Sequence, residues 1–135
     1  MKKLFKGLLV LAGILGLLVI GGTLAVRSIE ERMADLLETE VLDPALSEIP
    51  DGTYAGSCDA FAVKVVVRVR IEAGRIEEIV LVEHRNGQGA AGEAIVEDIL
   101  AAQSLELDAI AGATYSSKAI LLAVADALTN QRPAE

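Results

Sequence analysis

Residues 62–72, AVKVVVRVRIE, carry the clearest periodicity in the chain. Valine or isoleucine stands at every second position from residue 63 to residue 71, and charged side chains occupy most of the positions between them. Because successive side chains of a strand point to opposite faces, this pattern predicts a strand with one buried face. Ala73 and Gly74 form a turn signal in which glycine accepts a positive φ, so residues 75–84 are expected to return as an antiparallel partner. We expect this hairpin at the centre of the sheet.

Downstream of the hairpin, helical spacing resumes and predicts a helix over about residues 91–103. Leu105 and Leu107 alternate with polar residues, which predicts a short strand. An apolar, alanine-rich segment then predicts a helix over about residues 116–129, whose apolar face packs on the sheet. The tail, residues 131–135, is expected to be frayed.

Upstream of the hairpin, Asp51-Gly52-Thr53-Tyr54 predicts a turn that opens a short strand ending near Cys58. The elements together predict an α+β domain over residues 50–135, with an antiparallel sheet, a central hairpin and two packed helices. Cys58 is the only cysteine, so an intramolecular disulfide is excluded. We expect its side chain to be a small buried or half-buried group.

The N-terminal part of the chain reads as a membrane segment. Residues 4–26 are apolar except for Lys6 and Thr23, and about 20 such residues suffice for a helix to cross a bilayer. We therefore predict a transmembrane anchor over residues 1–27, and a helical stalk and connector over residues 28–49 whose helix ends at Asp43-Pro44. A cleaved signal peptide is the alternative, although the apolar run exceeds the usual core of such peptides.

Charge predicts the orientation of this anchor. Lys2, Lys3 and Lys6 precede the apolar run, whereas Arg27 follows it and is soon outweighed by acids that begin at Glu30. This distribution predicts a cytoplasmic N-terminus and an extracytoplasmic domain at the cell membrane. Four of the 12 basic residues and none of the 20 acids lie in the first 27 positions, so the remainder carries 8 − 20 = −12. Such an acidic domain would be repelled by nucleic acid or by an anionic lipid surface.

Residues 108–117, DAIAGATYSS, stand immediately before the last predicted helix. Thr114 and the serines after it would then lie at a helix N-terminus, where free backbone N–H groups and the positive end of the dipole favour an anion such as phosphate. Gly112 and Ala113 lack bulk, so a phosphate could approach the backbone closely. A hydroxyl-rich segment that merely caps a helix is the alternative interpretation.

This stretch resembles the flavinylation motif of the FMN-binding domain family, Asp-x-x-Ser/Thr-Gly-Ala-Thr/Ser. The matching positions are Asp108, Gly112, Ala113 and Thr114, whereas Ala111 stands where the family more often has a hydroxyl residue. The resemblance extends over about residues 51–128 and includes the strand end Glu83-His84-Arg85-Asn86.

The resemblance implies a covalent cofactor. In this family the hydroxyl equivalent to Thr114 is joined to the phosphate of FMN by a separate flavin transferase. Asp108 is then expected to be a carboxylate that the transferase recognises or that neighbours its metal. Ser116 and Ser117 are expected to cap the helix and bind phosphate, and Lys118 offers a cation unless it points to solvent.

Contacts to the flavin ring are open to more than one interpretation. His84 could hydrogen-bond the isoalloxazine, because its charge changes near neutral pH, or it could be a strand-end histidine without a cofactor contact. Asn86 and the residues up to Gly89 could line the flavin with backbone amides or form a simple loop. Tyr54 and Tyr115 are candidates for packing against the ring. We assign no catalytic residue and no metal ligand.

The sequence thus predicts a membrane-anchored, extracytoplasmic flavoprotein that passes electrons between membrane or extracellular redox partners through FMN. Whether it is an enzyme is left open, because two other classes remain. A flavin-dependent reductase with its own soluble acceptor is weakened by the lack of a Gly-x-Gly-x-x-Gly fingerprint for direct use of NADH. A flavin-free anchored interaction module would use the same fold as a scaffold.

Overall fold

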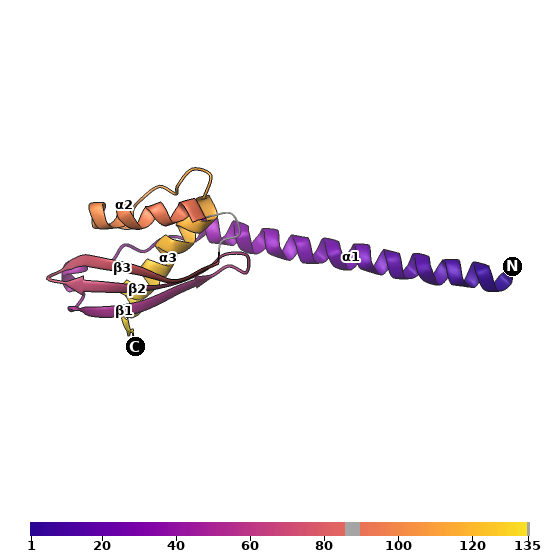
Figure 1. The fold of residues 1–135 in the computed structure, drawn as a ribbon, viewed down its shortest axis with the longest axis horizontal. Coiled ribbons are helices and arrows are strands. Elements are labelled where there is room, and N and C mark those ends of the chain that lie inside the picture. The colour runs from indigo at the N-terminus through magenta and orange to yellow at the C-terminus, as the bar shows by residue number, and fades with distance from the viewer. Residues whose placement is uncertain (86–89, 135) are drawn as a thin grey trace. The chain divides into compact units, whose positions relative to one another are not determined.

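The computed structural model describes residues 1–85 and 90–134. The chain divides into two compact units, Met1–Arg32 and Met33–Glu135. The helix α1 (Lys2–Glu38) makes up most of the first unit and supplies the first residues of the second (Figure 1).

The first unit is a helix with a long apolar stretch between charged ends. Its best 18-residue window has a mean hydropathy of 2.5, and none of that window is buried. A helix of this length and composition can cross a membrane, because it satisfies its own backbone groups and offers only apolar side chains to lipid. The predicted N-terminal helix is therefore present, and it runs on beyond the apolar stretch to Glu38, close to the predicted end of the stalk.

The second unit contains one antiparallel sheet with the strand order β3-β2-β1-β4. The strands are β1 (Gly52–Asp59), β2 (Lys64–Glu72), β3 (Arg75–Arg85) and β4 (Arg132–Pro133). The predicted hairpin is β2–β3, and both residues of its turn have positive φ, as a tight turn between right-twisted strands requires. The predicted α+β class with an antiparallel sheet is confirmed, but the hairpin does not lie at the centre of the sheet, because β3 is at one end of the strand order.

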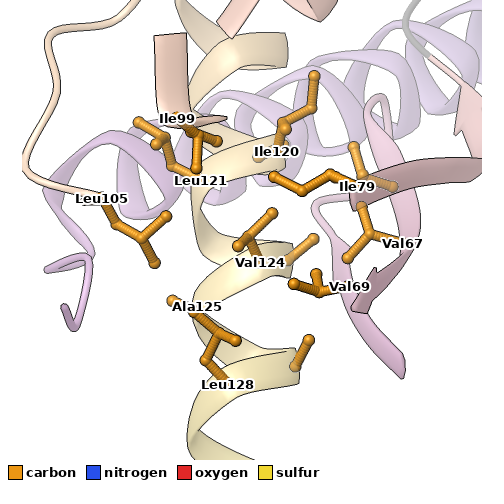
Figure 2. Close-up of a cluster of buried hydrophobic side chains, with 14 of the residues drawn as sticks. Val67, Val69, Ile79, Ile99, Leu105, Ile120, Leu121, Val124, Ala125 and Leu128 are labelled. Atoms are coloured by element: carbon orange, nitrogen blue, oxygen red, sulfur yellow. The ribbon is translucent and has the colours of Figure 1, made fainter. Parts of the chain in front are cut away.

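The core lies between the sheet and α3 (Thr114–Asn130), as Figure 2 shows. The alternate residues of β2, from Val65 to Ile71, are at most 1% exposed and face the helix, as their period of two predicts. On the other side of α3 lie Ile99 and Leu105, so the helix is enclosed on two sides (Figure 2). This enclosure explains why α3 buries ten of its residues.

The helix expected over residues 91–103 is present in two parts. It begins as a 3-10 turn, η2 (Ala90–Ala94), and continues as α2 (Ile95–Ala102). Gln103 ends it in the left-handed conformation, with φ +55°. The Gln103 side-chain amide accepts from Ile76 N–H at 2.8 Å and donates to Ile76 O at 2.9 Å, which fastens α2 to β3.

The strand predicted at Leu105 and Leu107 is wrong, because residues 106–110 have no regular structure. A connector side chain supplies hydrogen bonds in place of a strand partner. Asp43 accepts from Ser104 Oγ at 2.6 Å and from Leu105 N–H at 3.1 Å. The alternation of the leucines marks a loop whose apolar side chains are buried or half-buried, with Leu105 only 1% exposed.

The tail also differs from its prediction. It is not frayed at Arg132 and Pro133, which form β4 and pair with β1. Ala134 N–H donates to Thr53 O at 3.0 Å, and the Arg132 guanidinium pairs with Asp126 of α3. These contacts hold the end of the chain on the sheet.

Candidate functional site

Thr114 is the first residue of α3 and is exposed. The N-cap residue is Ala113, and no side chain caps the helix, so its first N–H groups have no capping oxygen from a side chain. Tyr115, the next residue, is 41% exposed. A threonine hydroxyl and an uncapped helix N-terminus are therefore presented together at the surface, which suits a phosphate.

The turn before Thr114 accounts for the glycine of the motif. Ala113 N–H donates to Ile110 O at 3.0 Å, and Gly112, the third residue of this turn, has φ +79°. A positive φ at that position is the mark of a type II turn and favours glycine. A Cβ on Gly112 would meet nothing within 4 Å. Glycine is thus needed here for its backbone conformation, whereas the sequence suggested a lack of bulk.

The two serines after the motif are buried, and the prediction that they cap the helix is wrong. Ser117 is 0% exposed; its hydroxyl donates to Ala113 O at 2.9 Å and accepts from Ile110 N–H at 3.0 Å. Ser116 is 2% exposed and packs under Gly92 of η2, where an added Cβ would lie only 2.8 Å from the Ser116 Cβ. The buried Ser117 hydroxyl therefore holds the turn in place. The close packing of Gly92 on Ser116 brings η2 against α3.

A β-bulge at Val82 changes which face of β3 the following residues occupy. Glu83 lies opposite Val66 of β2. The next pair toward the hairpin turn is Leu81 with Val67, so Val82 has no opposite residue. The extra residue shifts the alternation by one position, as bulges do.

The bulge places His84 on the helix-covered face. His84 lies opposite the fully buried Val65, and its side chain is 4% exposed. The His84 Nδ1 atom is 2.7 Å from Glu93 Oε1 of η2. The histidine therefore joins β3 to η2 and does not present its ring at the surface. The sequence did not indicate Glu93 as the partner of His84. Asn86, which was expected near the flavin, lies outside the described residues.

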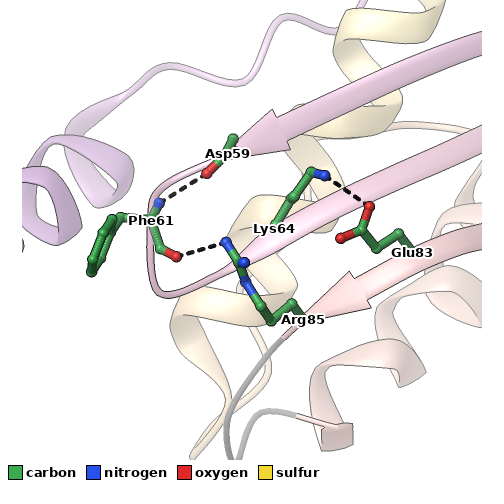
Figure 3. A network of polar contacts seen from close by, with 5 residues as sticks. All are labelled: Asp59, Phe61, Lys64, Glu83 and Arg85. Atoms are coloured by element: carbon green, nitrogen blue, oxygen red, sulfur yellow. Dashed lines mark hydrogen bonds and ion pairs between the residues drawn. The ribbon is translucent and has the colours of Figure 1, made fainter.

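The turn between β1 and β2 is held against the end of β3 (Figure 3). Phe61 has φ +63°, its N–H donates to Asp59 Oδ1 at 3.0 Å, and its carbonyl accepts from Arg85 Nη2 at 2.9 Å. Lys64 forms a surface ion pair with Glu83 at 2.8 Å, as expected for a solvated strand face. These contacts fix the strand end from which the chain leaves toward η2.

Asp108 and Lys118 line one open cavity of about 610 Å³, which we call the Asp108 groove. Its walls are residues 37–41, residues 105–108 and Lys118, all within the second unit. Asp108 is exposed, whereas Lys118 is half-buried. The structure therefore brings two of the motif-region residues together, and it adds the end of α1 and the start of the connector, which sequence reasoning did not assign to the site.

Two further side chains play no part in this site. Tyr54 is 8% exposed and donates its hydroxyl to Pro50 O at 2.7 Å, so it belongs to the core, contrary to its suggested packing on the ring. Cys58 is half-buried as predicted. Burial and the nearby charges of Asp59 and Asp126 raise the pKa of Cys58 to about 11, so its thiol stays protonated at neutral pH.

Comparison with known proteins identifies the family. The model of the FMN-binding domain family matches residues 61–129, about half of the chain, including the hairpin, His84 and the whole motif. The chain belongs to the FMN-binding domain family, and this membership supports a flavin-binding protein with FMN as its cofactor. The exposed Thr114 hydroxyl at an uncapped helix start fits the phosphate of such a cofactor.

One relative is an uncharacterized protein of Treponema pallidum (strain Nichols), 34% identical over 90 residues. The match covers 64% of this chain and 25% of that protein, so the chain spans about a quarter of the relative's length. No solved structure gives a significant match.

Proposed function

We propose that this chain is a membrane-anchored, extracytoplasmic electron carrier whose FMN is joined by a phosphoester to Thr114. The observation that carries the proposal is the position of Thr114: an exposed hydroxyl on the first residue of a helix that no side chain caps, inside the matched family region. An electron carrier needs an attachment point for FMN and no substrate site of its own, because the bound FMN supplies the reversible redox chemistry while the protein fixes its position and potential.

The residues around Thr114 have separate tasks in this proposal. The Thr114 oxygen forms the new bond to phosphorus as the pyrophosphate bond of FAD breaks and AMP leaves, and the hydroxyl proton passes to a base of the flavin transferase. The open N–H groups of the first turn and the Lys118 ammonium then balance the phosphate charge. Ser117 holds the turn that presents Thr114, with its hydroxyl 2.9 Å from Ala113 O.

His84 has a positioning role in the proposal. Its bond to Glu93 holds η2, and Gly92 of η2 packs on the buried Ser116 of α3. The histidine therefore supports the first turn of α3 from behind the surface on which Thr114 lies. We do not assign it a direct contact with the ring, because only 4% of its side chain is exposed.

The orientation of the anchor is part of the proposal and has its own test. The lysines at positions 2, 3 and 6 favour a cytoplasmic N-terminus, so the domain should face outward. Protease added to intact cells that lack an outer barrier should remove the domain. Digestion only after lysis would reverse the orientation, and a chain released from the membrane without residues 1–27 would favour the signal-peptide alternative.

The attachment is tested by coexpression with an active flavin transferase. Thr114→Val keeps the β-branched shape and removes the oxygen, so it should fold but show no flavin fluorescence that survives denaturing electrophoresis. Thr114→Ser should keep part of that fluorescence, and Ser116→Ala should keep it in any folded fraction. Covalent flavin in Thr114→Val would reassign the attachment site. A wild-type chain without flavin would favour the interaction-module alternative, and rapid NADH turnover by the loaded chain would favour the reductase.

A further inference from the structure

We infer that the sheet face turned away from α3, which we call the open face, is a surface through which two copies of this chain associate. The open face consists of alternate residues of β2 and the residues opposite them in β1 and β3; those of β2 are Lys64, Val66, Arg68, Arg70 and Glu72. The intervening residues of β2 are buried against α3, whereas those of the open face are all exposed or half-buried. This inference goes beyond the proposed function and does not depend on the flavin.

The cations of the second unit are concentrated on the open face. The unit Met33–Glu135 contains seven Lys and Arg residues and 18 acids, a net charge of 7 − 18 = −11. The open face holds five of these cations and four of the acids, a net charge of 5 − 4 = +1. The five cations are Lys64, Arg68, Arg70, Arg75 and Arg85. Two copies of the unit therefore repel each other least when their open faces meet.

In the middle of the open face, charges of opposite sign stand on neighbouring strands. Lys64 of β2 pairs with Glu83 of β3 at 2.8 Å, and Arg70 Nε of β2 lies 3.7 Å from Glu78 Oε2 of β3. Arg68 lies between these two cations on β2 and is exposed. Among the described residues it has neither a hydrogen bond nor an ion pair. Its guanidinium is therefore the charge on this face that the chain itself does not balance.

A second copy related by a two-fold axis brings unlike charges together. With the axis parallel to the strands and between β2 and β3, β2 of each copy lies over β3 of the other, and the two sheets are about 10 Å apart. Arg68 is opposite Val80, and Glu78 and Glu83 are opposite the open-face residues next to Arg68 on β2. Arg68 of one copy thus lies over Val80 of the other, about 7 Å along the strand from either carboxylate. Those carboxylates are 58% and 44% exposed, so each can accept a second donor.

This charge pattern favours a second copy over other occupants. A surface of one sign, such as an anionic lipid surface or a purely acidic protein, would meet like charges on one of the two strands. The size of the face indicates a reversible contact. Three strands with the nine-residue length of β2 cover about 30 Å by 14 Å, or about 400 Å² per copy, whereas a stable interface buries about 800 Å² per partner. Two chains anchored in one membrane, as proposed above, have a raised effective concentration, which favours such a weak contact.

Arg68→Glu and the double variant Glu78→Arg/Glu83→Arg form a complementary pair for a test. In either variant alone, like charges face each other across the two-fold axis, so self-association should weaken about tenfold or more. In an equal mixture, the carboxylate introduced in the first variant meets the guanidinium groups introduced in the second, so mixed dimers should form about as readily as wild-type dimers. Arg32→Glu makes the same change of charge on α1, outside the open face, and should associate as the wild type does.

The measurement uses full chains made without the flavin transferase and purified in detergent. Chains that carry donor or acceptor dyes at their N-terminal ends are mixed, and energy transfer is followed against protein concentration and again in lipid vesicles. Transfer that Arg68→Glu retains unchanged would overturn the inference, because the contact would then lie in the anchor or elsewhere.

Three further outcomes would contradict the inference. Wild-type chains that show no transfer in vesicles do not associate, and a mixture of the two charge variants that shows no transfer excludes the two-fold arrangement. Binding of the detergent-purified chain to phosphatidylglycerol vesicles that Arg68→Glu loses, without any transfer between chains, would assign the open face to a lipid surface instead. None of these outcomes depends on flavin loading, which tests the proposed function separately.

Discussion

The two ends of α3 are built in opposite ways. At its N-terminus Thr114 and Tyr115 are exposed and no side chain caps the helix. Toward its C-terminus Asp126 accepts from Ser57 N–H of β1 at 2.9 Å and from Asn130 Nδ2 at 2.5 Å, and it pairs with Arg132 of β4. One end leaves its polar groups available, and the other satisfies them within the protein.

The two ends of this helix therefore have different roles. The C-terminal end contributes to stability, and the N-terminal end is left open for a ligand. Buried contacts stabilise the C-terminal half, where Gly56 of β1 lies against the backbone of the helix. The N-terminal turn can then remain uncapped, although a missing cap costs a helix about 1 kcal/mol. The closed end should therefore respond to substitution by unfolding, and the open end should respond by losing flavin.

Gly56 of β1 provides the largest expected effect on stability. A Cβ at this position would lie 2.1 Å from Ala123 O and 2.4 Å from Ala127 N, both backbone atoms of α3. Because neither atom can move without shifting the helix, Gly56→Ala should lower the free energy of unfolding by about 3 kcal/mol or more. Thermal unfolding followed by circular dichroism measures the change.

Gly112→Ala is the control at the open end. Its Cβ would enter open space, so only the positive φ is strained and the expected cost is about 1–2 kcal/mol. If Gly56→Ala unfolds no earlier than Gly112→Ala, the close contact between β1 and α3 is not the stabilising feature described above.

Asp126 provides the next effect. Asp126→Ala leaves Ser57 N–H and Arg132 without their carboxylate, and because both residues are exposed, so that water can replace it, the expected cost is about 1 kcal/mol. Asp126→Asn keeps one acceptor oxygen and should fall between Ala and wild type in a urea titration. Flavin loading should fall in proportion to the folded fraction in both variants. A stable Asp126→Ala that loads no flavin would place this residue in the maturation step and break the comparison.

The sequence predicts the fold well where a hydrophobic pattern repeats over many residues. It predicts the fold poorly where a single side chain determines the local structure. Alternating valines in β2 indicate the strand and its buried face, and the apolar run before Arg27 indicates the long N-terminal helix. The leucines at positions 105 and 107 also alternate, but Asp43, about 60 residues away in the chain, satisfies that loop. Periodicity cannot distinguish such a loop from a strand, because both bury every second side chain.

The same distinction between local patterns and long-range contacts applies to the site. The motif predicts Thr114 at the start of a helix, and the structure places it there. It does not predict that Ser116 and Ser117 are buried, because their burial depends on η2 packing over α3. The inward position of His84 depends on a one-residue bulge at Val82, which leaves no mark in the composition of β3. A local pattern thus identifies Thr114 as the proposed attachment residue, whereas long-range packing determines its supporting contacts.

Asp108→Ala should give the smallest change in stability and the clearest test of the difference between the two ends of α3. Asp108 is exposed, and none of the described residues forms a hydrogen bond or ion pair with its carboxylate, so the free energy of unfolding should change by no more than about 0.5 kcal/mol. If the flavin transferase reads this carboxylate, covalent flavin should nevertheless fall strongly, as measured by in-gel fluorescence and by the mass of the intact chain. Glu106→Ala is the matched control, since Glu106 is an exposed acid in the same groove but outside the motif, and this variant should load normally. Equal loading of the two variants would remove Asp108 from the site, and an Asp108→Ala chain that unfolds early would show that this carboxylate belongs with the stabilising contacts of the closed end.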